Sequence, residues 1–337
     1  MEKAMSATEA LSETSNLRYT IKDIVNFREK GEHLELETYD EIYTLPASYK
    51  KNILELKETL PIKVFNPNDI TEKSLEILPQ LKKTGLVVSL RDSNSSMPGT
   101  EFYKECFSKN IDRWIDNAFS HSAWQEMMNG TADVNVFIGW LFELFHYTKN
   151  ANRHMPLSVA HCADKRIKTL FAVHFKEEWN HYHFFRRALE AYGFSREEVE
   201  NSDPLPMTEQ MSNLMREAAR KDVLCYAICS ALLEGTTIDN ESYDNFYEIV
   251  REKYSLPKGT IKPIYEHLEL DEKYGHADLF LEICEGIQSI SVERAEEAVK
   301  YASLMSENIL AWSENISDYY SNKFSEIPRV KADIFDA

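Results

Sequence analysis

From residue 101 to residue 325 the sequence carries helical patterns almost without interruption. Short polar, glycine-containing or proline-containing stretches separate the apolar-periodic segments. The predicted helices are 101–119, 122–129, 133–149, 157–193, 207–234, 240–254, 258–286 and 291–324. Glycine is scarce, at 10 of 337 residues, whereas a sheet-rich fold needs more of it in its turns. Because 43% of the residues are hydrophobic, the chain has enough apolar side chains for a core, and we predict a mainly α fold.

Residues 17–91 mix strand and helix patterns. Alternating apolar residues on both sides of Gly31 predict a β-hairpin, and Asp69 is a candidate N-cap for a later helix. The predicted elements are a hairpin over 24–28 and 34–38, helices over 46–60 and 69–83, and a strand over 86–88. These elements make a small α+β domain of the winged-helix kind.

A linker is predicted at residues 92–100, which are rich in Ser, Asn, Pro and Gly. The helical domain then covers 101–325. We expect a disordered, polar tail at 1–16 and a second tail at 326–337.

The formal net charge of −18 opposes non-specific binding to nucleic acid, whose phosphates attract basic surfaces. No apolar run approaches the roughly 20 residues that span a membrane, and the N-terminus lacks the apolar segment of a signal peptide. The five cysteines are scattered and form no CxxC pair, which fits a reducing compartment. We expect a cytoplasmic protein.

The segment from Leu170 to Leu189 carries three metal-type side chains on one stripe. His174, Glu178 and His181 are spaced four and three residues apart. At 100° per residue they lie within about 60° of one another around a helix. Their neighbours are mostly apolar, and polar side chains in such surroundings are costly unless they share a partner.

Two later segments carry comparable residues. Glu234 is the only charge in a long apolar run, so we expect it to be paired, protonated or bound to a metal. Further along, His267, Asp271 and Tyr274 repeat the spacing of four and three residues. His276 follows nine residues after His267, about 180° around a helix, so it faces away unless the helix unwinds.

Helical bundles build dinuclear iron or manganese sites from such residues, with bridging carboxylates and terminal imidazoles. Mixed nitrogen and oxygen donors suit iron or manganese better than zinc, which favours Cys and His. A solvated Glu–His pair or a hydrogen-bonded core histidine explains any one of these residues taken alone. Because the same pattern of faces occurs twice, we predict a metal site.

The helical region resembles the heme-oxygenase-like diiron oxidases, which are close in fold to the TenA thiaminases and the pyrroloquinoline quinone oxidase PqqC. The resemblance covers about 119–324. Two motifs carry it: EEWNH at 177–181, which is like the family's EExxH, and HLELDEKYGH, which begins at His267. It implies a heme-oxygenase-like helical bundle that binds two Fe(II) ions and uses O2 as a co-substrate. The implied iron ligands are Glu178, His181, Glu234, His267 and Asp271.

Tyr274 stands where the family's motif has its last histidine. Three interpretations stay open. The phenol ligates the metal after ionisation, His174 supplies the missing imidazole, or the site is mononuclear or weakly loaded. We predict that one iron is held firmly and the second loosely, with His174 among the metal ligands and Tyr274 in contact with substrate.

The resemblances also imply where substrates bind. The family places the helix that carries Glu143 and His146 along the substrate pocket, so we expect both residues to line it. The N-terminal region resembles the PqqD-like modules through residues 44–47, 53–54 and 81–87. That resemblance implies a domain that binds a leader peptide or a carrier protein.

The predicted function is an O2-dependent non-heme iron oxidase or oxygenase of a biosynthetic pathway. Its substrate would be amino-acid-like, fatty-acid-like or peptide-borne, and we expect a homodimer with no nucleic-acid or membrane partner. One alternative is a metal-free enzyme of the PqqC or TenA type, in which Glu234 and the histidines act as acid and base. Another is a non-catalytic helical protein that binds peptides.

Overall fold

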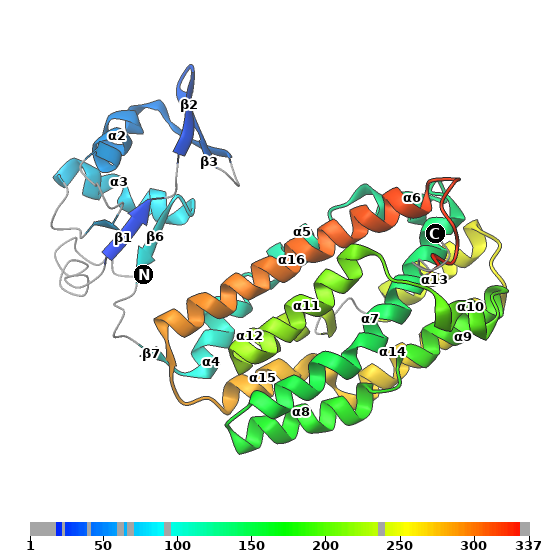
Figure 1. Ribbon diagram of the computed structural model, residues 1–337. Coiled ribbons are helices and arrows are strands. Elements are labelled where there is room, and N and C mark those ends of the chain that lie inside the picture. Colours follow the sequence, from blue (N-terminus) through cyan, green and yellow to red (C-terminus); the bar gives the residue numbers. More distant parts are fainter. Residues whose placement is uncertain are drawn as a thin grey trace, which may run out of the picture. The chain divides into compact units, whose positions relative to one another are not determined.

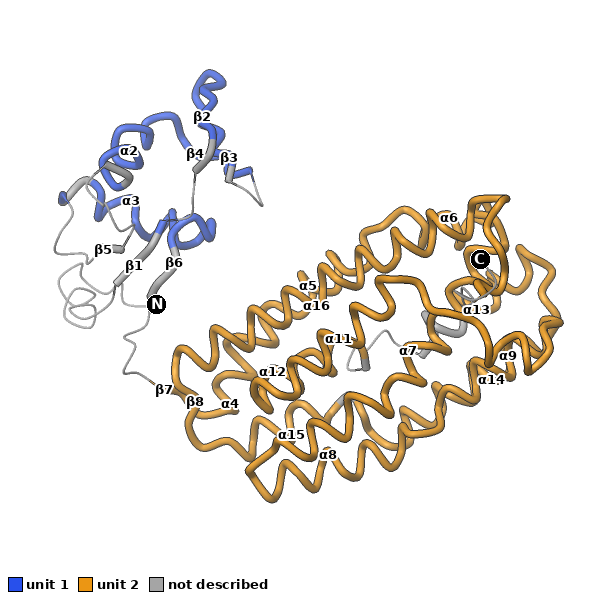
Figure 2. The backbone as a smooth tube through the Cα atoms, viewed as in Figure 1, with its two compact units in different colours: residues 1–95 blue, residues 96–337 orange. Residues whose placement is uncertain are grey.

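A computed structural model of the protein describes residues 18–21, 24–38, 42–58, 64–65, 71–90, 96–234 and 240–330. The chain divides into two compact units, residues 1–95 and 96–337 (Figure 2). Each unit has a hydrophobic core of its own. The division falls within 92–100, where the composition predicts a linker. The tail predicted at 1–16 lies outside the described residues, as do residues 331–337 of the second tail.

The described residues of the first unit form two small antiparallel sheets and two α-helices (Figure 1). In one sheet β1 lies between β5 and β6, and in the other β3 lies between β2 and β4. The bounds are β1 Arg18–Ile21, β2 Ile24–Lys30, β3 His33–Thr38, β4 Ile42–Pro46, η1 Ala47–Tyr49, α2 Lys50–Glu58, β5 Val64–Phe65, α3 Glu72–Lys83 and β6 Val87–Leu90.

The hairpin predicted around Gly31 is confirmed as β2 and β3, and Gly31 turns the chain with a φ of +62°. Strand β4 was not predicted, although Tyr43 and Leu45 are buried and alternate with exposed neighbours, as in a half-buried strand. The predicted N-cap Asp69 lies outside the described residues. Thr71 caps α3 instead, because its side chain accepts a hydrogen bond from the backbone of the first turn.

The second unit is a bundle whose long helices run roughly along one direction (Figure 1). Its bounds are β7 Ser96–Met97, α4 Gly99–Phe102, η3 Tyr103–Phe107, α5 Ile111–Ala118, α6 Ser122–Asn129, α7 Val134–His161, α8 Lys165–Glu178, α9 Tyr182–Tyr192, α10 Arg196–Asn201, α11 Pro206–Lys221, α12 Val223–Glu234, α13 Asn240–Lys253, α14 Lys258–Tyr274, η4 His276–Asp278, α15 Leu279–Glu285, β8 Ile290–Ser291 and α16 Val292–Tyr320. In the described ranges no helix is long and apolar enough to cross a membrane.

Helix α7 packs against α8, α9, α11 and α16. Every residue from Val136 to Phe142 is buried, which is typical of a helix surrounded by others. Gly139 permits close contact with α16, since a Cβ at this position would lie 2.1 Å from the ring of Tyr320. Helix α12, which is also strongly apolar, packs against α11 and α16. The candidate ligands are therefore carried by helices fixed against a dense core.

Several predicted long helices are interrupted where a short polar side chain binds the backbone. The prediction of one helix over 157–193 is wrong, because Asp164 accepts a hydrogen bond from an N–H of the next helix at 2.8 Å and starts α8 there. The gap predicted between 149 and 157 is absent, since α7 runs through it. The helix predicted over 207–234 breaks at Asp222, whose carboxylate accepts from a backbone N–H of α12 at 2.8 Å.

Candidate metal centre

The first candidate ligands come together where α8 ends. Helix α8 stops at Glu178, and the chain turns through 179–181 before α9 begins. The turn keeps two predicted ligands together, because Nδ1 of His181 lies 2.9 Å from Oε2 of Glu178. His174, one helical turn before Glu178, is 3% exposed, while Glu178 and His181 are 8% and 2% exposed. All three predicted side chains of this stripe are therefore buried.

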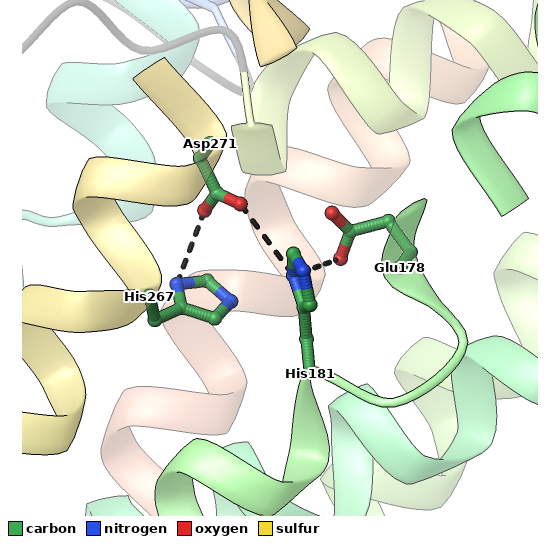
Figure 3. Close-up of side chains that lie close together, drawn as sticks. All are labelled: Glu178, His181, His267 and Asp271. Carbon is green, nitrogen blue, oxygen red and sulfur yellow. Dashed lines mark ion pairs between the residues drawn. The ribbon is translucent and has the colours of Figure 1, made fainter. Parts of the chain in front are cut away.

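Helix α14 brings two more predicted ligands to the same place. Nδ1 of His267 lies 3.1 Å from Oδ2 of Asp271, and Oδ1 of Asp271 lies 3.5 Å from Nδ1 of His181. Figure 3 shows that these side chains and Glu178 turn toward one another. One donor atom from each of the four lies within 4.8 Å of the others. We call Glu178, His181, His267 and Asp271 the first group.

His276 was expected to face away from these residues unless the helix unwinds, and the structure shows that the helix ends just before it. Helix α14 ends at Tyr274, Gly275 adopts the left-handed conformation with a φ of 71°, and η4 begins. This break turns the His276 side chain inward, where it is 7% exposed. Its Nδ1 lies 3.2 Å from Oε1 of Glu178. The 180° between His267 and His276 holds only for a continuous helix, and α14 ends before it reaches His276.

His276 completes a second group of candidate ligands. Donor atoms of His174, Glu178 and His276 lie within 4.8 Å of one another, and the rings of the two histidines are 4.7 Å apart. Glu177, which was not predicted to take part, places Oε2 3.4 Å from Nε2 of His276. Glu178 belongs to both groups: Oε2 faces His181 and Oε1 faces His276.

Tyr274 occupies the surface instead of the place of a ligand. Its side chain is 42% exposed. Its ring stacks on that of His276, with 5.7 Å between the centroids and an angle of 28° between the planes. An imidazole does lie among the candidate ligands, that of His276, two residues later in the chain. A glycine directly after a helical pattern is a common helix end, so Gly275 was the signal that could have predicted this change.

Glu234 is the last residue of α12. Its side chain lies outside the described part of the structure, and so does the chain from 235 to 239. Its predicted role as a ligand stays a prediction.

Glu143 and His146 lie on α7 and have partners within the protein. Oε2 of Glu143 accepts hydrogen bonds from the backbone N–H of Leu205, at 3.0 Å, and from the hydroxyl of Thr208, while Oε1 accepts from the hydroxyl of Tyr320 at 2.8 Å. Burial raises the pKa of the Glu143 carboxyl, and these hydrogen bonds oppose that effect. Both oxygens are thus engaged in joining α7 to α11 and α16. The predicted role of Glu143 in lining a substrate pocket stays a prediction.

His146 is 7% exposed, and its Nε2 lies 2.8 Å from the hydroxyl oxygen of Ser202. This contact ties α7 to the segment that follows α10. A substrate contact by His146 stays a prediction.

The comparison with known protein families bears on the two groups. Residues 138–307, about half of the chain, match the model of a family described as iron-containing redox enzymes. The chain belongs to this family. The matched range includes every residue of the first and second groups, from His174 to His276.

Solved structures with similar folds are also found for this chain. A domain of unknown function with a heme oxygenase-like fold from Shewanella denitrificans OS217 has a TM-score of 0.55 at 18% identity, and the match covers 67% of this chain and 97% of that chain. A TenA homolog from Pseudomonas syringae pv. tomato DC3000 has a TM-score of 0.49 at 13% identity, covering 67% and 95%. No curated protein matches the chain. The first likeness confirms the predicted heme-oxygenase-like fold of the helical unit.

The donor set suits the metal that the family description implies. The two groups together offer four imidazoles and two carboxylates. Such nitrogen and oxygen donors suit iron or manganese, whereas the Cys-rich sets of structural zinc sites are of another kind. Burying the carboxylate of Glu178 and the imidazoles of His174, His181 and His276 is costly, and a shared cation offsets that cost. The residues of the two groups therefore fit bound iron.

Proposed function

We propose that the protein is an O2-dependent, non-heme iron oxidase or oxygenase with two iron positions. The observation that supports this proposal most is the position of Glu178, whose two oxygens face histidines of different groups. A carboxylate placed in this way is suited to bridge two metal ions. A metal-free acid–base enzyme would have no need to gather four histidines around the carboxylates of Glu178 and Asp271.

Each group would hold one ion. In the first group His181, His267 and Asp271 would join Glu178, and in the second group His174 and His276 would do so. Ferrous ions bound here would supply the electrons for reducing O2 while an organic substrate is oxidised. The predicted ligand Glu234 would add a further carboxylate from α12.

Neighbouring residues orient the ligands and keep water away from them. The carboxylate of Glu177 faces Nε2 of His276 at 3.4 Å, so that the other ring nitrogen turns toward Glu178. The rings of Phe184 and Phe185 lie 5.7 and 5.2 Å from the ring of His267. These aromatic side chains cover the first group on the side of α9 and lower the local polarity.

The resemblance of the first unit to peptide-binding modules supports a peptide-borne or carrier-borne substrate, held through the first unit. Among the strands that the structure describes, β6 lies at one end of the sheet order β5-β1-β6, where an extended peptide could add a strand. Because the helical unit has its own core, a chain without residues 1–95 should fold and bind iron. It should lose affinity for a peptide-borne substrate, and an unchanged kcat/KM would contradict this part of the proposal.

The test of the proposed function is anaerobic loading of the full chain with Fe(II), followed by metal counting and exposure to O2. We expect about two irons per chain, as in other bundles of this kind, and O2 consumption that depends on the iron. Full O2 consumption by the metal-free protein, or no retention of iron, would contradict the proposal.

A further inference from the structure

A buried phenol and a buried imidazole meet between α12 and α7. The hydroxyl oxygen of Tyr226 lies 3.0 Å from Nδ1 of His154. Tyr226 is 1% exposed and His154 is 3% exposed, so solvent does not surround this contact. Neither side chain belongs to the two groups of candidate ligands. Polar atoms at this depth are costly to bury, and the hydrogen bond between the two side chains offsets part of that cost.

The pair lies close to the second group. The ring of Phe171 packs edge-on against that of Tyr226, with 5.3 Å between the centroids, and His174 follows Phe171 by three residues on α8. Helix α12 also contacts η4, which begins with His276. Phe171 and Ala227, the residue after Tyr226, line a small hollow together with His276. The phenol is therefore near two candidate ligands without being one of them.

The chemistry of a phenol explains what such a pair can do. Removing one electron from a phenol makes its hydroxyl strongly acidic, so the electron leaves readily only where a base accepts the proton. An imidazole is a much stronger base than water at neutral pH. Nδ1 of His154 lies within hydrogen-bonding distance of the Tyr226 hydroxyl. The burial of both side chains also protects a radical on the ring from solvent. Base, distance and burial together favour a reversible oxidation of Tyr226.

We propose that Tyr226 is a redox-active residue that gives one electron to the metal centre after the centre has been oxidised by O2. The inference rests on the proposed function, since the oxidised iron is the oxidant. In this step the O–H bond of Tyr226 breaks, its electron reduces the iron centre by one electron, and its proton passes to Nδ1 of His154. A neutral phenoxyl radical and an imidazolium remain. The step spares the metal ligands when no organic substrate is present to be oxidised.

Tyr274 is the competing electron donor, because its ring stacks on that of His276 at 5.7 Å. Its side chain is 42% exposed, so its proton would pass to water and its radical would meet solvent. Both conditions make its oxidation less favourable than that of Tyr226. The experiment therefore compares the two tyrosines directly.

The test detects the radical itself. The full chain is loaded with Fe(II) without O2, mixed with O2, frozen at increasing times and measured by electron paramagnetic resonance. We expect a tyrosyl signal that narrows when the protein is made with ring-deuterated tyrosine. Tyr226→Phe should remove the signal with the iron content unchanged, while Tyr274→Phe and the equally conservative Tyr301→Phe, at a buried position on α16, should keep it. A tyrosyl signal that persists in Tyr226→Phe, or its absence from the natural protein, overturns the proposal.

The role of His154 has a separate test. His154→Gln keeps an oxygen that accepts a hydrogen bond from the phenol but removes the base, so the yield of the radical should fall several-fold. Nitrogen-15 magnetic resonance of the natural, metal-free protein needs no variant. It should show Nδ1 without a proton and Nε2 with one. A protonated Nδ1 would overturn the role of His154 as the proton acceptor.

A measurement without iron separates this proposal from the proposed function. Azide radicals made by pulse radiolysis take electrons from aromatic side chains, and electron transfer within the metal-free protein then leaves the radical on the most easily oxidised one. We expect a long-lived tyrosyl radical that Tyr226→Phe abolishes and Tyr301→Phe does not. That result in a protein that retains no iron supports the oxidisable pair and contradicts the proposed function. A radical of equal yield and lifetime in Tyr226→Phe overturns the pair, even if the protein binds iron and consumes O2.

Discussion

Most of the candidate metal ligands lie near the ends of α8 and α14, and the two ends differ in how they place the histidine that follows. At the end of α8 the chain turns through 179–181, and His181 stays close to Glu178, as a continuous helix would also have placed it. At the end of α14, Gly275 adopts the left-handed conformation and ends the helix, and His276 lies inside and not on the far side. Residue spacing therefore indicates a common face only as long as the helix continues.

The largest loss of iron is expected for a substitution of Glu178, because this residue belongs to both groups. Glu178→Ala should reduce the iron content from about two per chain to nearly none, because both groups lose a carboxylate. Metal counting after anaerobic loading measures this. Glu177→Ala removes the same charge one residue earlier and should affect only the second group, so equal losses in the two variants would contradict the shared role of Glu178.

A smaller loss of iron is expected when a histidine of only one group is replaced. His267→Ala at α14 and His276→Ala at η4 should each lower the iron content from about two to about one, since each removes an imidazole from one group. Far-ultraviolet circular dichroism checks that both variants fold. His183→Ala is the control, because this histidine belongs to neither group. If His276→Ala keeps all its iron, the second group is not a metal site.

Glu143 offers a contrast with Glu178, since its oxygens face hydrogen-bond donors instead of histidines. Its pKa is raised by burial, so its contribution to stability is fully present below the ordinary pKa of 4.5 and is lost as the pH rises through the raised pKa.

Glu143→Gln removes this titration. The difference in unfolding free energy between Glu143→Gln and the natural protein should therefore increase in favour of Gln as the pH rises above 4.5. Denaturant unfolding at several pH values measures it. A difference that does not vary with pH would show that Glu143 titrates normally.

Gly275→Ala should lower the free energy of unfolding by about 1–2 kcal/mol, because an L-residue is strained in the left-handed conformation. Space is not the obstacle, since an added Cβ at Gly275 meets nothing within 4 Å. Gly31→Ala has the same open surroundings and a similar φ in the first unit, so it should cost a similar amount. Only Gly275→Ala should also weaken iron binding at the second group. Equal iron affinity in both variants would contradict the role of this turn in placing His276.

The smallest effect is expected at Tyr274. If this tyrosine replaced a ligand, Tyr274→His would raise the iron content. The exposed ring makes that outcome inconsistent with the structure, and we expect Tyr274→His and Tyr274→Phe to bind as much iron as the natural protein. A higher iron content in Tyr274→His, but not in Tyr274→Phe, would instead support the interpretation that Tyr274 stands in the place of a ligand.

The sequence was sufficient to predict the helical fold and the facing stripes, because apolar periodicity and ligand spacing are local properties. It was insufficient for the helix breaks, which depend on single side chains such as Asp164 and Asp222 that bind the backbone. The position of His276 could have been predicted from Gly275. The partners of Glu143 could not, since Leu205, Thr208 and Tyr320 are distant in sequence.

The central claim is that two metal positions meet at Glu178, and anomalous diffraction at the iron absorption edge tests it most directly. Crystals grown and loaded with Fe(II) without O2 should show two peaks. One should lie among Glu178, His181, His267 and Asp271, and the other among His174, Glu178 and His276. A single peak, or a second peak beside Tyr274, would contradict the account.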